Sequence, residues 1–86
     1  MRIETEDLSL VNAAQIAELG IEAIRSGDAS FDLSAVQTCD SSALAVLLAW
    51  QREAHASSRS LHLSGVPEDL LALATVYGVK DVLAIS

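Results

Sequence analysis

Residues that build most catalytic and ligand-binding sites are scarce in this sequence. Its 86 residues include one cysteine, two histidines and a single Phe, Trp and Tyr. Cys39 on its own can form neither an internal disulfide nor a cysteine-based metal site. So few aromatic side chains leave little material for an aromatic cage or for platforms that stack nucleic-acid bases.

Positive charge is scarce as well. The chain has 5 Lys and Arg residues against 12 Asp and Glu, which gives a net charge of −7. Nucleic acids and anionic membrane surfaces repel such a chain, because affinity for phosphates depends on Lys and Arg. The composition therefore predicts no nucleic-acid partner and favours association with a basic protein surface.

Long hydrophobic runs are missing, although 51% of the residues are hydrophobic. The longest uninterrupted apolar run, Ala43 to Trp50, has 8 residues, whereas a helix that spans a bilayer needs about 20. No Lys- or Arg-led apolar stretch opens the chain, so we expect no signal peptide. We expect a cytoplasmic protein without direct membrane insertion, folded as one domain over residues 1–86.

Sequence patterns typical of catalytic sites are also missing. The chain has no glycine-rich phosphate loop and no G-x-G-x-x-G pattern. His55 and His62 have no acidic or cysteine partner at metal-ligand spacing, so we expect both on the surface. Cys39 has no histidine to activate it as a nucleophile, and we expect a small buried side chain at a strand end. The sequence therefore predicts a protein that is not an enzyme and has no cofactor or metal.

Strand and helix patterns alternate along the chain. Ile3, Leu8 and Leu10 predict one short strand or two fragments. Apolar residues then recur at helical spacing from Ala13 to Arg25, with Asn12 as the N-cap. The elements predicted after this helix are a strand over 30–36, a helix over 43–55, a strand over 61–63 that ends at Gly65, a helix opened by Pro67 and closed by Gly78, and a last apolar patch of Val82, Leu83 and Ile85.

The order of these elements predicts the fold class. Strands that alternate with helices form βαβ units, which give an α/β domain with a small, mainly parallel or mixed β-sheet. Leu70, Leu73, Ala74 and Tyr77 form the expected apolar stripe of the helix that Pro67 opens.

A polar turn, Asp40-Ser41-Ser42, opens the middle helix. The first N–H groups of a helix have no partner within it, and its dipole favours negative charge there. A hydroxyl at this point can cap the helix. A phosphate on Ser41 would gain hydrogen bonds from the same N–H groups, although the carboxylate of Asp40 opposes it.

The middle helix shows two faces. Leu44, Leu47, Leu48 and Gln51 share one face, and Ala43, Trp50 and Ala54 extend it on one flank. Small side chains form a second stripe that carries no charge before Arg52. Either other elements of the domain cover this stripe, or it contacts another protein. We favour protein contact through a docking stripe of Asp40, Ser41, Ser42, Ala45, Val46, Ala49 and Arg52.

These residues resemble a known family. Asp32-Leu-Ser followed by Asp40-Ser41-Ser42-Ala43-Leu44-Ala45-Val46-Leu47-Leu48 is similar to the signature of STAS domains, the fold of bacterial anti-sigma factor antagonists. The segments 61–67 and 73–79 match the family's next strand and third helix, so the resemblance covers roughly residues 12 to 83. Many members have Gly where this chain has Ala43, and the N-terminal region lacks a clear strand-Gly-strand hairpin. The resemblance implies a STAS-like fold with three to four helices and a regulatory hydroxyl at Ser41.

Within the family, the closest similarity is to MlaB-type subunits. It is carried by the Ser-Ala-Leu-Ala-Val-Leu-Leu helix and by the ending from Pro67 through Tyr77-Gly78-Val79 to Leu83. This resemblance implies an accessory subunit that binds the ATPase (MlaF-like) of an ABC transporter, associated peripherally with the inner membrane through the complex. Such a transporter moves phospholipids between membranes and maintains outer-membrane lipid asymmetry.

The alternative within the family is an anti-sigma factor antagonist that a partner kinase phosphorylates at Ser41. The Tyr77-Gly78-Val79 ending and the short N-terminal region favour the transporter subunit over this alternative. The sequence leaves open whether the domain forms a homodimer when its partner is absent.

Overall fold

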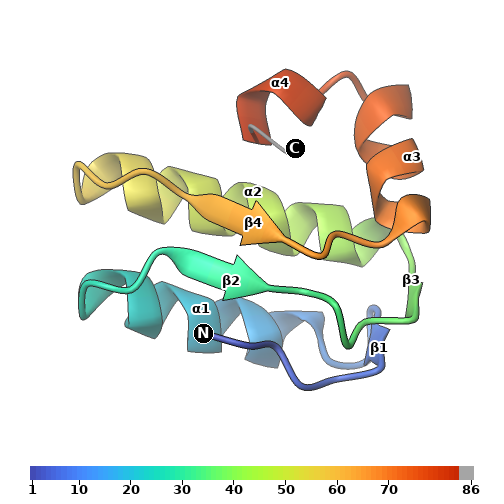
Figure 1. The fold of residues 1–86 in the computed structure, drawn as a ribbon, viewed down its shortest axis with the longest axis horizontal. Coiled ribbons are helices and arrows are strands. Elements are labelled where there is room, and N and C mark those ends of the chain that lie inside the picture. The colour runs from blue at the N-terminus through green and yellow to red at the C-terminus, as the bar shows by residue number, and fades with distance from the viewer. Residues whose placement is uncertain (84–86) are drawn as a thin grey trace.

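Short parallel strands alternate with helices over residues 1–83, the part of the chain that the computed structural model describes (Figure 1). This is the expected α/β order. The elements are β1 (Asp7–Leu8), α1 (Ala13–Arg25), β2 (Ser30–Asp32), β3 (Thr38–Cys39), α2 (Ser41–Ala56), β4 (His62–Ser64), α3 (Glu68–Val76) and α4 (Lys80–Leu83).

Every strand pair within residues 1–83 is parallel. β2 pairs with β4, with Phe31 opposite Leu63, and β1 pairs with β3, with Leu8 opposite Cys39. A bridge between Arg2 and Asp32 adds the N-terminal segment beside β2. The N-terminal region thus forms two short strand fragments, which is one of the two arrangements that the sequence left open.

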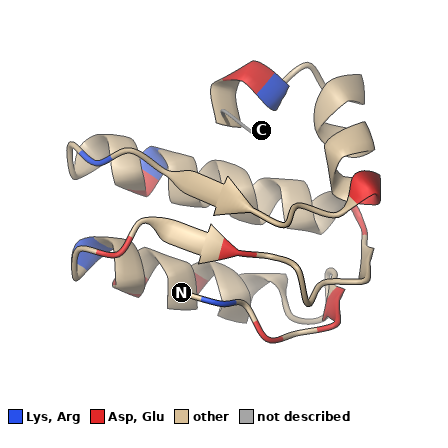
Figure 2. Cartoon of the chain, in the orientation of Figure 1, with Lys and Arg blue, Asp and Glu red and all other residues tan. Residues whose placement is uncertain are grey.

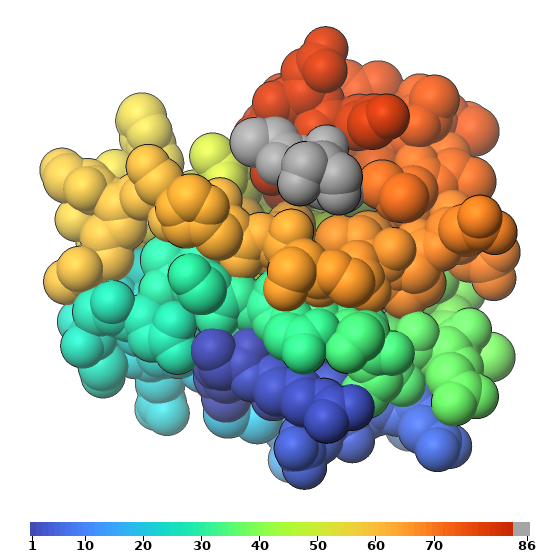
Figure 3. Space-filling model, in the orientation of Figure 1, coloured from blue at the N-terminus to red at the C-terminus, as the bar shows by residue number. Residues whose placement is uncertain are grey.

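The helices and strands form two layers. α1 and α2 lie side by side behind β2 and β4 (Figure 1). On the opposite face, the N-terminal segment, β2 and β4 run next to one another with no helix over them (Figure 3).

A stacked aromatic pair joins the two layers. The rings of Phe31 and Trp50 lie 4.3 Å apart at 18°, and the indole Nε1 of Trp50 donates a hydrogen bond to the carbonyl of Ala17 at 3.1 Å. A Cβ atom at Gly20 would lie 2.1 Å from that same nitrogen, so α1 approaches α2 this closely because residue 20 has no side chain.

The predicted strand over 30–36 is wrong beyond Asp32. There the carboxylate of Asp32 accepts a hydrogen bond from the amide of Ser34 at 2.9 Å, and the amide of Val36 donates to the carbonyl of Leu33 at 3.0 Å. These bonds turn the chain, which then forms β3 with a different partner. Leu33 and Val36 are both buried, although residues three positions apart in a continued strand would point to opposite faces.

The helix ends agree with the sequence more closely. α1 has the predicted bounds, although the side chain of Asn12 accepts from the amide of Ser9 and does not cap the helix. α2 begins at Ser41, earlier than predicted. α3 begins at Glu68, with Pro67 at the N-cap position and not at the first helical position. Gly78 follows α3 with φ +71°, as expected of a glycine that ends a helix.

Two expectations near the C-terminus need correction. Tyr77 does not belong to the apolar stripe of α3, because its side chain is 59% exposed. In the expected last apolar patch, Leu83 is buried but Val82 is exposed, and Ile85 lies outside the described residues. No helix within residues 1–83 combines the length and the apolar character needed to cross a bilayer.

Candidate functional site

The carboxylate of Asp40 organises the start of α2. One oxygen accepts from the amide of Ser42 at 2.8 Å, and the other accepts from the amide of Leu10 at 3.1 Å. These two hydrogen bonds lower the pKa of Asp40 below its usual value, and the bond from Leu10 has the larger effect. Asp40 therefore caps α2 and ties it to the loop between β1 and α1.

The expectation of unpaired amides at this helix start is wrong for two residues. The amide of Ser42 already donates to the side chain of Asp40, and the amide of Ala43 donates to the Asp40 carbonyl at 3.0 Å. The N–H groups of Ser42 and Ala43 are therefore already hydrogen-bonded, one to the capping side chain and one within the first turn.

Ser41 is the first residue of α2 and is exposed. Its hydroxyl has no hydrogen-bond partner among residues 1–83. Because the side chain of Asp40 caps the helix, capping does not occupy the hydroxyl of Ser41.

The docking stripe is mostly accessible, with one exception. Ser41, Ala45 and Arg52 are exposed, and Ser42 and Ala49 are half-buried. Val46 is only 2% exposed, so its expected place on an open surface is wrong. α1 packs against this side of α2 and covers it.

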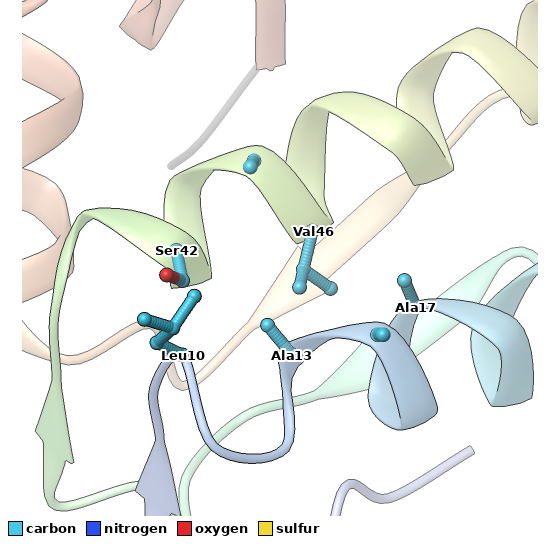
Figure 4. A pocket seen from close by; sticks show the side chains of 7 residues that line it. Leu10, Ala13, Ala17, Ser42 and Val46 are labelled. Atoms are coloured by element: carbon cyan, nitrogen blue, oxygen red, sulfur yellow. The ribbon is translucent and has the colours of Figure 1, made fainter.

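A shallow apolar groove runs between the first half of α1 and the first half of α2 (Figure 4). Leu10 faces Ser42 at one end of it, and Val46 points from α2 toward Ala13 and Ala17 on α1. We call it the α1/α2 groove; its volume is about 340 Å³, and its lining is Leu10, Ala13, Ala14, Ala17, Ser42, Ala45 and Val46.

The groove is open because the facing side chains are small. Where Gly20 meets Trp50 the two helices are in tight contact. Toward their N-termini, alanines face Ser42 and Ala45, and these side chains do not fill the space. A partner's backbone or a single apolar side chain can reach the floor of the groove.

A second hollow lies on the other side of Ser41, between the start of α2 and α3. We call it the α2/α3 groove; its volume is about 360 Å³, and its lining is Cys39, Asp40, Ser41, Asp69, Ala72, Leu73 and Val76. Ser41 and Ser42 thus stand between two grooves.

Large apolar side chains beside these grooves were not among the predicted site residues. Leu10 is 79% exposed, Val11 is 94% exposed and Val76 is 79% exposed. The expectation that Leu10 belongs to a strand is wrong, because β1 ends at Leu8 and Leu10 lies in the turn before α1. For Val76 the sequence offered no signal, since it continues the apolar pattern of α3.

Three carboxylates influence the half-buried thiol of Cys39. Burial raises its pKa, and the nearby charges of Asp69, Asp40 and Asp7 raise it further. The thiol is therefore held in its neutral form, which is unsuited to nucleophilic attack. We call Asp7, Asp40 and Asp69 the acidic collar.

Arg52 does not join the other stripe residues. It lies near the C-terminal end of α2, about 16 Å along the helix from Ser41 at 1.5 Å per residue. Arg25 and Arg59 lie at that same end of the molecule, since Arg59 sits near Gly27 just after α1. In Figure 2, β1 and the start of α3 carry acidic residues, whereas the far ends of α1 and α2 carry both basic and acidic residues.

His55 and His62 are exposed, as expected, and lie on α2 and β4. Within residues 1–83, no group of three or more His, Cys, Asp and Glu side chains is arranged to hold a metal ion. The acidic collar is thus a charged surface and not a coordination site.

The family model described as Mlab, STAS domain, matches residues 5–84, nearly the whole chain. No curated protein matches.

Proposed function

Because the chain belongs to the STAS domain family, in the group that the Mlab model describes, we propose that it is a non-catalytic accessory subunit. Its partner is the ATPase of an ABC transporter that moves phospholipids between the inner and outer membranes and so maintains outer-membrane lipid asymmetry. The domain is cytoplasmic and reaches the inner membrane through this complex.

One observation carries the proposal: Ser41 stands exposed between two apolar grooves that nothing in residues 1–83 fills. Exposed Leu10, Val11 and Val76 extend the apolar area on both sides. Exposed apolar area of this kind beside an accessible hydroxyl favours a protein-docking site.

The second candidate is an anti-sigma factor antagonist switched by phosphorylation of Ser41. The exposed hydroxyl favours it, since a kinase could reach that group. Two other features oppose it. The amides of Ser42 and Ala43 already have partners, and the acidic collar would repel a phosphate dianion. We therefore place this function second.

The test is a bulky substitution in the α1/α2 groove. Ala45→Phe fills the groove, and we expect it to weaken binding to the transporter ATPase about tenfold or more, which corresponds to about 1.4 kcal/mol. Ala56→Phe is the matched control, because Ala56 is an exposed alanine of the same helix outside both grooves.

Co-purification and titration with the ATPase measure the effect, and circular dichroism confirms that both variants fold. Equal binding by Ala45→Phe and the unchanged protein would contradict the proposal. Stoichiometric phosphorylation of Ser41 by a cognate kinase, detected by mass spectrometry, would favour the second candidate.

A further inference from the structure

The surface around Ser41 carries charge of one sign only. Asp7 comes from β1, Asp40 precedes α2 and Asp69 lies in the first turn of α3. Asp40 and Asp69 line the α2/α3 groove together with Cys39, and Asp7 accepts a hydrogen bond from the hydroxyl of Thr38, the residue before Cys39, so the three carboxylates gather around the end of β3. The basic residues of the chain, none of which lines either groove, are Arg2, Arg25, Arg52, Arg59 and Lys80.

Two of these carboxylates are held in place by neighbouring groups. Asp7 accepts from the hydroxyls of Thr38 at 2.7 Å and Ser9 at 2.8 Å, and Asp40 accepts from two backbone amides. A carboxylate has about four acceptor positions, so each keeps capacity for another donor. An incoming cation therefore meets acceptors that need little reorganisation.

We propose that the occupant of this surface is a partner helix whose apolar side chains enter the grooves and whose flanking Lys or Arg side chains meet the acidic collar. This inference rests on the proposed function, because it specifies the part of the ATPase that docks. The apolar grooves contribute contact area, and the collar contributes orientation and a faster encounter.

Charge decides between this occupant and a second copy of the chain. In a symmetric dimer through this surface, each acidic collar would face the other, because such an interface uses the same patch on both subunits. Like charges placed opposite each other are unfavourable. Each copy also carries a net charge of −7.

The experiment compares two substitutions that change the net charge of the protein by the same amount. Asp69→Lys reverses a charge of the collar. Asp81→Lys makes the same change at another exposed aspartate, also in the first turn of its helix but on α4, which lines neither groove. Because both variants have the same net charge, any difference between them is local.

Binding kinetics with the purified ATPase are measured by surface plasmon resonance. We expect the association rate constant of Asp69→Lys to fall about 3–10-fold relative to Asp81→Lys. This difference should shrink as ionic strength rises from about 0.05 to about 0.5 M, because salt screens exposed charges.

The outcomes separate this inference from the proposed function. Tight binding with equal association rate constants for both variants would contradict the inference of a basic partner helix. The proposed docking function would not be contradicted by that result. Absence of binding by the unchanged protein would overturn the docking function itself. Dimerisation of the isolated domain that Leu10→Lys abolishes would assign the surface to a second copy and would also overturn the inference.

Discussion

Cys39 shows how one side chain's chemistry follows from its neighbours. It ends β3, where burial and three carboxylates from three different elements favour the neutral thiol. The sequence placed it correctly at a strand end. It could not reveal the carboxylates of Asp7 and Asp69, which lie 32 and 30 residues away and meet only in the fold.

We expect Cys39 to react slowly with alkylating agents. Its raised pKa leaves less thiolate than a free cysteine has at pH 8, and thiolate is the reacting form. The measurement is the iodoacetamide rate by mass spectrometry in the native protein and in the chain unfolded by urea. Asp69→Asn should increase the native rate, because it removes the largest charge effect. A native rate equal to that of the unfolded chain would contradict this assignment.

Val46 illustrates what a helical projection misses. Seen on α2 alone, Val46 shares the outer stripe with Ala45 and Ala49, and the sequence predicted all three as partner contacts. In the fold, α1 lies along that side of α2, so Val46 is buried while Ala45 stays exposed. The angle between two helices depends on long-range packing, which no single helix pattern contains.

At the scale of elements, the packing of α1 on α2 creates the candidate site. Gly20 and Trp50 fix their closest approach, and alanines nearer the N-termini leave the α1/α2 groove. Periodicity and end residues gave the bounds of α1 correctly, since both are local signals. The predicted strand over 30–36 is wrong beyond Asp32 because an alternating pattern contains no information on the side-chain hydrogen bond of Asp32 that turns the chain.

We expect Gly20→Ala to destabilise the domain. In a helix, alanine is favoured over glycine by about 1 kcal/mol. A new Cβ would however meet the ring of Trp50, which is fully buried and stacked on Phe31, and overpacking of this kind costs about 1–3 kcal/mol or more. Chemical denaturation measures the net loss of unfolding free energy.

A double-mutant cycle tests the cause. Trp50→Leu makes room at the contact, so Gly20→Ala should cost less in that background than in the unchanged protein. An equal cost in both backgrounds would show that the indole ring is not what requires glycine at position 20.

At the scale of the whole molecule, the uneven distribution of charge affects both the kind of partner that can bind and the dependence of stability on pH. The acidic composition predicted a basic protein partner, and the fold gathers part of that negative charge at the start of α2. Hydrogen bonds lower the pKa of three aspartates: backbone amides donate to Asp28 and Asp40, and the side chain and then the amide of Ser34 donate to Asp32. Asp28 lies in the turn before β2, Asp32 is the last residue of β2, and Asp40 directly precedes α2.

These three groups predict loss of stability in acid. A carboxylate whose pKa is lower in the folded state than in the unfolded chain stabilises the fold above its unfolded pKa, near 3.9. That contribution is lost as the pH falls through the folded value. We therefore expect a thermal unfolding temperature that changes little between about pH 5 and 7 and falls below about pH 4.

Asp40→Asn removes one of these titrating groups, so its unfolding temperature should fall less between about pH 5 and 3 than that of the unchanged protein. Glu22→Asn, at an exposed position of α1, is the control, because it leaves all three aspartates in place. Equal acid sensitivity of the two variants would show that the bonds from Leu10 and Ser42 to Asp40 do not couple the start of α2 to folding.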